Sequence, residues 1–189
     1  MLVNGVGIND ADYLVEYRKD GKRVRCPAYR AWSNMIARCY GGAHIAYSEC
    51  RVDSAWLSFM TFRLWWLSNY KVGYDLDKDI LHPGNKVYGP DKCLYIPKWL
   101  NTFINAQYNN RGNLPIGVSM RGGYKQKPYL AQCKYNGKTV YLGVYTTPEE
   151  AHAKWLRFKL DIIDSRKQEL DGVYPNLSGI VRAKILSLR

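Results

Sequence analysis

Residues 114–159 constrain the fold of this chain more than any other stretch, because they hold the signals of a small sheet followed by a helix. Residues 129–135 alternate apolar and polar side chains, and Asn136-Gly137 then supplies a two-residue turn. This pair is typical of a β-hairpin, since a type I′ turn needs positive φ at both central positions. Residues 139–145 form the returning strand, and residues 115–120 form a further short strand before them. The pattern predicts a three-stranded antiparallel sheet.

A helix is expected directly after these strands. Thr147 is placed to cap it, Pro148 suits its first position, and Glu150 completes a capping box. Apolar residues recur at helical spacing along one face: Ala151, Trp155, Phe158 and Ile162. We expect that face to cover one side of the sheet. The other side is then free to meet a partner.

The charge of this region predicts what the partner is. Residues 106–148 contain no Asp or Glu and six basic residues: Arg111, Arg121, Lys125, Lys127, Lys134 and Lys138. The chain has a net charge of +12, and residues 106–189 hold 14 basic and 6 acidic residues of the total. Such a segment repels itself unless it meets an anion, and the phosphates of nucleic acid are the commonest such anion. Nucleic acid is therefore the predicted partner.

The same region resembles the ethylene-response-factor (APETALA/ERF) type DNA-binding domain. The resemblance rests on Gly117-Val118, on residues 129–134, on Tyr141-Leu142-Gly143 and on residues 147–151. That family lays a three-stranded antiparallel sheet in the major groove of DNA and backs the sheet with one helix. The resemblance therefore implies double-stranded DNA as the partner.

Carried over by position, the family's DNA-contacting residues fall on all three strands. They are Ser119 and Arg121, Gln132 and Lys134, and Thr139 and Tyr141, and the basic segment adds Lys125, Lys127 and Lys138 to the predicted DNA-binding set. Ser119 and Thr139 stand where the plant domains usually have arginine, and Gly123 stands where they have tryptophan. We therefore do not expect the sequence preference of the plant domains.

A second motif occupies residues 74–101: an acidic strand, a Gly84-Asn85 turn, a second strand and a short helix. This order resembles the ββα-metal finger of HNH homing endonucleases, in which a metal stabilises charge on the phosphate and a histidine activates water. The resemblance places Asp77 and Asn101 as ligands of Mg²⁺ or Mn²⁺. Lys78 takes the position of the catalytic histidine, and Asp79 lies beside it.

Lys78 departs from the nuclease pattern in a way that matters chemically. A lysine with an ordinary pKa of about 10.4 is protonated at neutral pH, so it binds phosphate but does not readily accept a proton. Asp79, or His82 from the turn, would then have to serve as the base. The alternative is a degenerate finger in which Asp77 and Asp79 cap the backbone or pair with cations. Both interpretations stay open at this point.

The predicted fold class is α+β. Residues 1–105 are expected to form an HNH-like domain with an N-terminal hairpin and helices, residues 106–113 a linker, residues 114–171 the ERF-type domain, and residues 172–189 a C-terminal helical tail. A hairpin is expected around Asp20-Gly21, and a helix over residues 27–40. The inner stripe of this helix consists of Trp32, Met35, Ile36 and Cys39.

A second helix is expected to begin at Asp53 or Ser54 and to continue to about residue 70. Its predicted inward residues are Trp56, Phe59, Met60, Leu64 and Leu67.

Composition bears on cofactors and location. The five cysteines include no C-x-x-C pair, so we expect reduced and buried thiols, with zinc at Cys39, Cys50 and Cys93 plus His44 or His82 as the alternative. No stretch approaches the ~18 to 20 apolar residues of a membrane span, and the start does not look like a signal peptide.

The arrangement as a whole resembles a family of small phage-encoded proteins grouped with HNH homing endonucleases, which implies the cytoplasm of an infected bacterial host. Three functions follow as hypotheses. They are a metal-dependent DNA endonuclease, a non-catalytic DNA-binding or regulatory protein, and a basic protein that inhibits a host protein or binds RNA.

Overall fold

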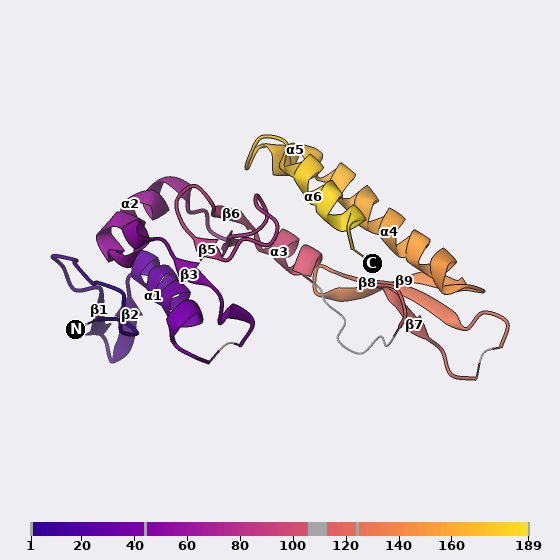
Figure 1. Cartoon of the computed structure of the whole chain (residues 1–189), viewed down its shortest axis with the longest axis horizontal. Coiled ribbons are helices and arrows are strands. Elements are labelled where there is room, and N and C mark those ends of the chain that lie inside the picture. The colour runs from indigo at the N-terminus through magenta and orange to yellow at the C-terminus, as the bar shows by residue number, and fades with distance from the viewer. Residues whose placement is uncertain (1, 44, 106–112, 124, 189) are drawn as a thin grey trace. The chain divides into compact units, whose positions relative to one another are not determined.

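The structure is a computed structural model that describes residues 2–43, 45–105, 113–123 and 125–188. The fold is α+β, as predicted, and the chain divides into two compact units, Met1–Tyr95 and Ile96–Arg189 (Figure 1). The division lies inside strand β6 (Leu94–Pro97), ahead of helix α3 (Lys98–Asn105). All of the predicted linker except Asn113 lies outside the described residues.

The first unit combines two α-helices with short strands. Its elements are β1 (Glu16–Lys19), β2 (Lys22–Arg25), α1 (Pro27–Tyr40), a 3₁₀ turn (Ile45–Tyr47), β3 (Arg51–Val52), a 3₁₀ turn (Ser54–Leu57), α2 (Phe59–Asn69), β4 (Tyr74–Asp77) and β5 (Val87–Tyr88). Antiparallel β1 and β2 form the predicted hairpin, β3 pairs with β5 in parallel, and β4 pairs with β6.

Helix α1 follows the sequence pattern closely. Pro27 occupies the start of the helix, where its missing N–H costs nothing, and Gly41 follows the end. The predicted stripe is buried, and Trp32 lies at its centre with no exposed surface. The Trp32 indole donates a 2.7 Å hydrogen bond to the carbonyl of Trp56, so the N–H group of this buried ring is satisfied.

The prediction for α2 is wrong in its start and in its last two inward residues, whereas Trp56 and Phe59 are buried and Met60 packs against the core as predicted. Asp53 caps the separate 3₁₀ turn by accepting from the Ala55 N–H at 3.0 Å. Ser58 caps α2 itself through the Thr61 N–H at 3.1 Å. The later start buries Phe62 instead of Leu64 and Leu67, of which 66% and 56% are exposed.

The second unit contains the predicted sheet. Its elements are α3, β7 (Val118–Met120), β8 (Tyr129–Tyr135), β9 (Lys138–Tyr145), α4 (Pro148–Ser165), α5 (Lys167–Asp171) and α6 (Leu177–Leu186). The strands lie in the order β7-β8-β9 and are antiparallel. Asn136 and Gly137 have φ of 50° and 74°, as the predicted turn requires.

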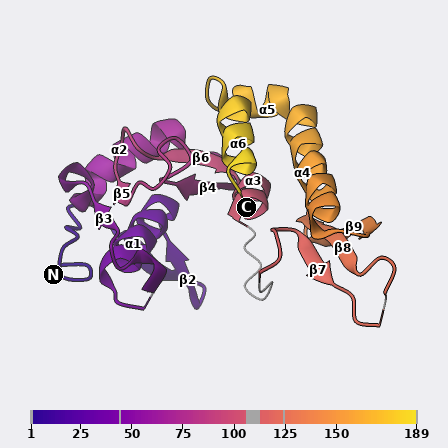
Figure 2. The same cartoon turned by 45° about the vertical axis from the view of Figure 1, so that its right-hand side comes forward.

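Helix α4 begins with the predicted capping box, since Thr147 accepts from the Glu150 N–H and Glu150 accepts from the backbone of the cap. The helix covers one face of the sheet, and α6 packs along α4 after the connection through α5 (Figures 1 and 2). Ala151 and Trp155 are buried as predicted, and the second half of the stripe differs from the prediction. Lys159 and Ile163 are buried, whereas Phe158 and Ile162 are only half-buried.

None of the helices in the described ranges combines the length and the apolar character that crossing a lipid bilayer requires.

Candidate nucleic-acid interface

Strand register assigns each sheet residue of the second unit to one of two faces. Val118 and Ala131 are opposite each other and pack with Ala151 of α4, so this face is the inner one. Side chains alternate along a strand, and the next residues therefore point outward. The outer face consists of three cross-strand rows: Ser119–Leu130–Val144, Gln132–Tyr141 and Lys134–Thr139.

A β-bulge decides which β9 residues reach the outer face. The register shifts between Ala131 and Gln132, so that Ala131 is opposite Gly143 while Gln132 is opposite Tyr141. Leu142 is the extra residue, and it packs against the inner core. Without this shift Tyr141 would lie on the face that α4 covers, because a change of one residue moves every following side chain to the other face.

The sheet therefore brings five of the predicted DNA-contacting residues onto one surface: Ser119, Gln132, Lys134, Thr139 and Tyr141. Tyr141 is 66% exposed, and Lys134 and Thr139 are exposed as well. None of the outer-face residues is acidic. Hydroxyl, amide and ammonium groups on such a surface can donate hydrogen bonds to phosphates and base edges.

The other predicted residues lie around the rim of the sheet. Arg121 follows β7, and its backbone N–H still pairs with the Pro128 carbonyl at 2.7 Å. Lys125 and Lys127 are exposed in the loop between β7 and β8. Lys138 is opposite Tyr135 and so alternates to the side opposite Thr139. The structure thus does not place Lys138 with the outer-face rows.

Sequence reasoning missed Leu130 and Val144, which complete the first row of the outer face between polar residues. Alternation within strand β8 indicated an outward Leu130. No signal in β9 fixed Val144, because its direction depends on the register with Leu130.

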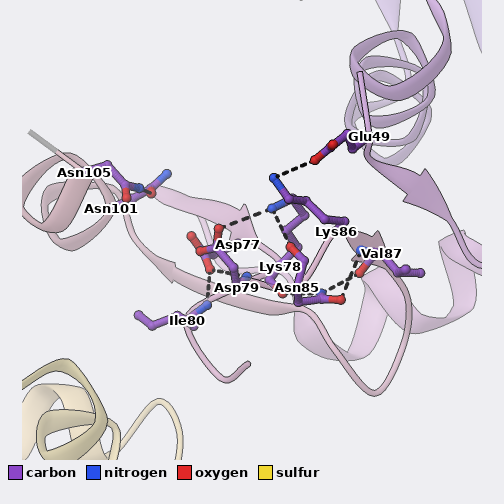
Figure 3. Close-up of polar contacts among 10 residues, drawn as sticks. All are labelled: Glu49, Asp77, Lys78, Asp79, Ile80, Asn85, Lys86, Val87, Asn101 and Asn105. Atoms are coloured by element: carbon purple, nitrogen blue, oxygen red, sulfur yellow. Dashed lines mark hydrogen bonds and ion pairs between the residues drawn. The ribbon is translucent and has the colours of Figure 1, made fainter. Parts of the chain in front are cut away.

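Asp77 in the first unit acts as a backbone cap. It is buried at the end of β4, and its Oδ1 atom accepts from the N–H groups of Asp79 and Ile80 at 2.9 and 2.7 Å (Figure 3). Two backbone donors on one carboxylate oxygen stabilise the sharp turn that follows the strand.

Asn85 closes the same loop from its other end. Its amide donates to the carbonyls of Lys78 and Val87 at 2.6 and 2.7 Å, and its oxygen accepts from the Val87 N–H at 3.1 Å (Figure 3). In the Gly84-Asn85 turn predicted from sequence, the Asn85 side chain thus fixes the loop backbone by hydrogen bonds.

Lys78 lies inside this loop. Its ammonium forms a 3.2 Å ion pair with Asp79 and donates to the Asn85 carbonyl at 2.9 Å. Only 11% of the side chain is exposed. Asp79, the predicted substitute base, is thus paired with the Lys78 ammonium. Lys78, at the position of the catalytic histidine, is bound to Asp79 and to the Asn85 carbonyl.

The predicted metal ligands belong to different units. Asn101 lies on α3, where its side-chain oxygen accepts from the Asn105 amide at 2.6 Å. Within the described ranges, no three His, Cys, Asp or Glu side chains are grouped as a metal site requires. A divalent cation favours anionic oxygens. The carboxylates of the loop, however, cap the backbone and pair with Lys78, so these residues do not fit a metal centre.

The cysteines are free thiols, and four of the five are buried. Burial raises the pKa of Cys39 to about 11 and that of Cys93 to about 12. Cys39, Cys50 and Cys93 pack in the apolar core of the first unit, as expected for buried thiols. His44, named with them as a zinc ligand, lies outside the described residues.

Comparisons of the chain with protein-family models, with curated proteins and with solved structures found no match.

Proposed function

We propose that the protein binds double-stranded DNA through the outer face of the β7-β8-β9 sheet, which docks in the major groove. The observation that carries the proposal is the bulge-set register. It gathers Gln132, Tyr141, Lys134 and Thr139 on the face that α4 leaves open. These side chains belong to a segment without acidic residues, and that charge favours a polyanion.

The size of the β8-β9 ribbon suits the proposed groove. Adjacent strands are separated by about 4.8 Å, and a two-stranded ribbon enters the roughly 12 Å wide major groove of B-DNA. Gln132 and Tyr141 form the middle row of this ribbon, so they would meet base edges. Lys134 lies one row further along and would meet a phosphate at the groove wall.

The geometry of the first unit favours the non-catalytic alternative over the nuclease. Asp77 caps two backbone groups, and Asp79 pairs with Lys78, so neither carboxylate is arranged to hold Mg²⁺ or Mn²⁺ or to take a proton from water. Metal-dependent cleavage stays a prediction from the resemblance to HNH enzymes. The cytoplasm of an infected bacterial host is a proposal of the same kind.

One gel separates these functions. The purified chain is incubated with linear duplex DNA in Mg²⁺, Mn²⁺ or EDTA, and mobility shift and cleavage are read together. We expect a shift in all three conditions without cutting. Cutting that needs the metal would establish the nuclease, and the lack of any shift would refute DNA binding and favour a protein or RNA partner.

A matched pair of variants tests the sheet. Replacing Arg121 and Lys134 by Ala should flatten the dependence of log affinity on log salt concentration by roughly 0.9 for each lost phosphate contact. Replacing Lys167 and Lys184 on α5 and α6 by Ala removes the same charge elsewhere in the unit. An equal change of slope in both variants would mean that net charge, and not the sheet, controls binding.

A further inference from the structure

The β1-β2 hairpin of the first unit is a second basic surface, separate from the sheet. Residues 16–25 contain five basic and two acidic side chains in two short strands joined by Asp20-Gly21. The hairpin lies at the edge of its unit (Figures 1 and 2). Its base is attached to the core through Val15, whose carbonyl accepts from the Cys26 N–H at 2.8 Å.

The register of this hairpin places like charges opposite each other. Arg18 is paired with Arg23, and Lys19 is paired with Lys22. Directly opposed like charges destabilise a strand pair. A hairpin that needed only to fold would gain from an acidic residue at one position of each pair. The arrangement therefore concentrates positive charge on a surface that attracts anions.

Glu16 neutralises only the lower part of the hairpin, and the second acid, Asp20, lies in the turn with one lysine on each side of it. Glu16 accepts from Arg23 at 2.6 Å and lies 2.9 Å from the Nε atom of Arg25, so one carboxylate serves two guanidinium groups. The side chains of Lys19 and Lys22 are exposed, and their ammonium groups make no hydrogen bond or ion pair to any residue that the structure describes. Two ammonium groups next to the turn are thus available to bind an external anion.

We propose that the β1-β2 hairpin is a second contact with double-stranded DNA, in which Lys19 and Lys22 bind the phosphate backbone. This inference rests on the proposed function, since it takes the same DNA as the partner, but it uses residues of the other unit. A protruding antiparallel ribbon with cations at its tip fits a phosphate-lined groove of B-DNA. We commit to duplex DNA because it is the partner proposed for the sheet, and the test below separates it from RNA.

The test is a salt titration of duplex DNA binding with the full chain. Lys19→Ala together with Lys22→Ala should lower the slope of log affinity against log salt by roughly 2 and weaken binding by about tenfold or more at moderate salt. The control is Lys71→Ala together with Lys86→Ala, two exposed lysines of the same unit outside the hairpin. The control should keep the slope and the affinity of the parent chain.

Stability provides a second readout that a merely structural role would not reproduce. The double variant removes both charges of the opposed Lys19–Lys22 pair and so relieves its repulsion. Its thermal midpoint should therefore stay equal or rise. Lys22→Glu extends the test, because it places an opposite charge across from Lys19. It changes the net charge by as much as the double variant does, so it should retain the fold and weaken DNA binding by a similar amount.

The two variants test DNA contact by the hairpin and by the sheet separately. A lowered slope in the hairpin variant with a folded chain supports the inference. An unchanged slope in that variant, with a lowered slope for Arg121 and Lys134, overturns the hairpin contact and leaves the sheet proposal standing. The reverse result supports the hairpin and refutes the sheet. A parent chain that binds RNA or an acidic protein but no duplex DNA overturns both.

Discussion

The ammonium of Lys159 donates a hydrogen bond to the backbone carbonyl of Phe103 and lies 3.9 Å from the centre of the Phe103 ring. The centre of the Trp155 ring lies 5.2 Å from the same Lys159 nitrogen. Lys159 has 1% of its surface exposed. A cation in this aromatic site connects α4 to the C-terminal part of α3. Among the residues that the structure describes, no carboxylate forms an ion pair with it, and desolvation by burial dominates its electrostatics.

Burial of this cation makes stability depend on pH. Loss of hydration lowers the pKa of Lys159 to about 8, while in the unfolded chain it keeps its ordinary value near 10.4. Between these values the folded state has released a proton that the unfolded state retains, so stability rises with pH in this window. Below pH 8 both states are protonated, and the cost of burying the charge is present in full.

We predict that the free energy of unfolding of the parent chain, minus that of Lys159→Met, increases by on the order of 2 kcal/mol from pH 7 to pH 10. Urea unfolding at several pH values measures this difference. Burial also raises the pKa of the neighbouring Cys133, but this thiol is present in both proteins. A difference that does not change with pH would mean that Lys159 is not buried as a cation.

Gly117 directly precedes β7, and its missing side chain lets the backbone approach the Trp155 ring. A Cβ atom at Gly117 would lie 2.1 Å from Cδ1 of that ring, and the residue has a φ of +82°. Gly123 has the same φ, but a Cβ there meets nothing within 4 Å. Comparing substitutions at the two glycines therefore separates the energetic cost of a left-handed backbone from the cost of steric overlap with Trp155.

We predict that Gly117→Ala loses about 1 to 3 kcal/mol more of unfolding free energy than Gly123→Ala. Both variants carry a penalty of about 1 to 2 kcal/mol for a left-handed backbone, and only the first also displaces Trp155. Thermal or urea unfolding of the two variants measures this. Equal losses would show that the ring moves aside at no cost.

Asp77 can be tested as a cap independently of any metal. Asp77→Ala removes the acceptor for the N–H groups of Asp79 and Ile80, and leaving such donors unsatisfied costs about 1 to 3 kcal/mol. Asp77→Asn keeps an oxygen acceptor at the same place but lacks the charge of a metal ligand. We expect the Ala variant to be clearly less stable than the Asn variant in urea unfolding, with duplex binding retained by both at low temperature.

The same pair also tests the nuclease hypothesis. If the Asn variant is as stable as the parent chain and a cleavage activity of the parent is lost in it, Asp77 acts as a ligand and not only as a cap. If both variants lose the same stability, the cap is not what Asp77 contributes.

Local signals in the sequence predicted the elements whose chemistry is local. The Asn136-Gly137 turn, the Thr147–Glu150 capping box and the start of α1 at Pro27 each depend on a few adjacent residues, and the structure confirms them. The predicted start of α2 was wrong because two capping residues, Asp53 and Ser58, follow one another in the sequence, and only Ser58 caps the α-helix.

Features set by contacts between elements could not be predicted in the same way. The bulge at Ala131/Gln132 depends on how β8 and β9 pair, so periodicity in β9 alone gives no face for Tyr141. Lys159 occupies a core position because Phe103 and Trp155 surround it, whereas hydrophobicity along α4 favoured Phe158. For the candidate site, the resemblance supplied the residues, and the register then showed which of them share a surface.

The amide of Gln132 is the outer-face group best suited to read a base. It lies in the middle row opposite Tyr141. A glutamine amide forms bidentate hydrogen bonds with the N6 and N7 atoms of adenine in the major groove. A good bidentate contact favours the correct base over a wrong one by about 1 to 3 kcal/mol. If the sheet docks as proposed, a preferred duplex should contain an adenine at one position that Gln132 contacts.

We predict that Gln132→Ala loses preference at that one position while it retains most of its affinity for other sequences. Preferred duplexes are first selected from a random pool with the parent chain, and affinities are then compared after exchange of each adenine for guanine or for 7-deazaadenine, which lacks N7. Lys134→Ala is the contrasting variant, because a phosphate contact weakens binding to all sequences alike. A parent chain that binds every duplex equally would leave the sheet as a binder of the backbone and remove Gln132 from base recognition, whereas a uniform loss in Gln132→Ala would show that its role is to support the sheet.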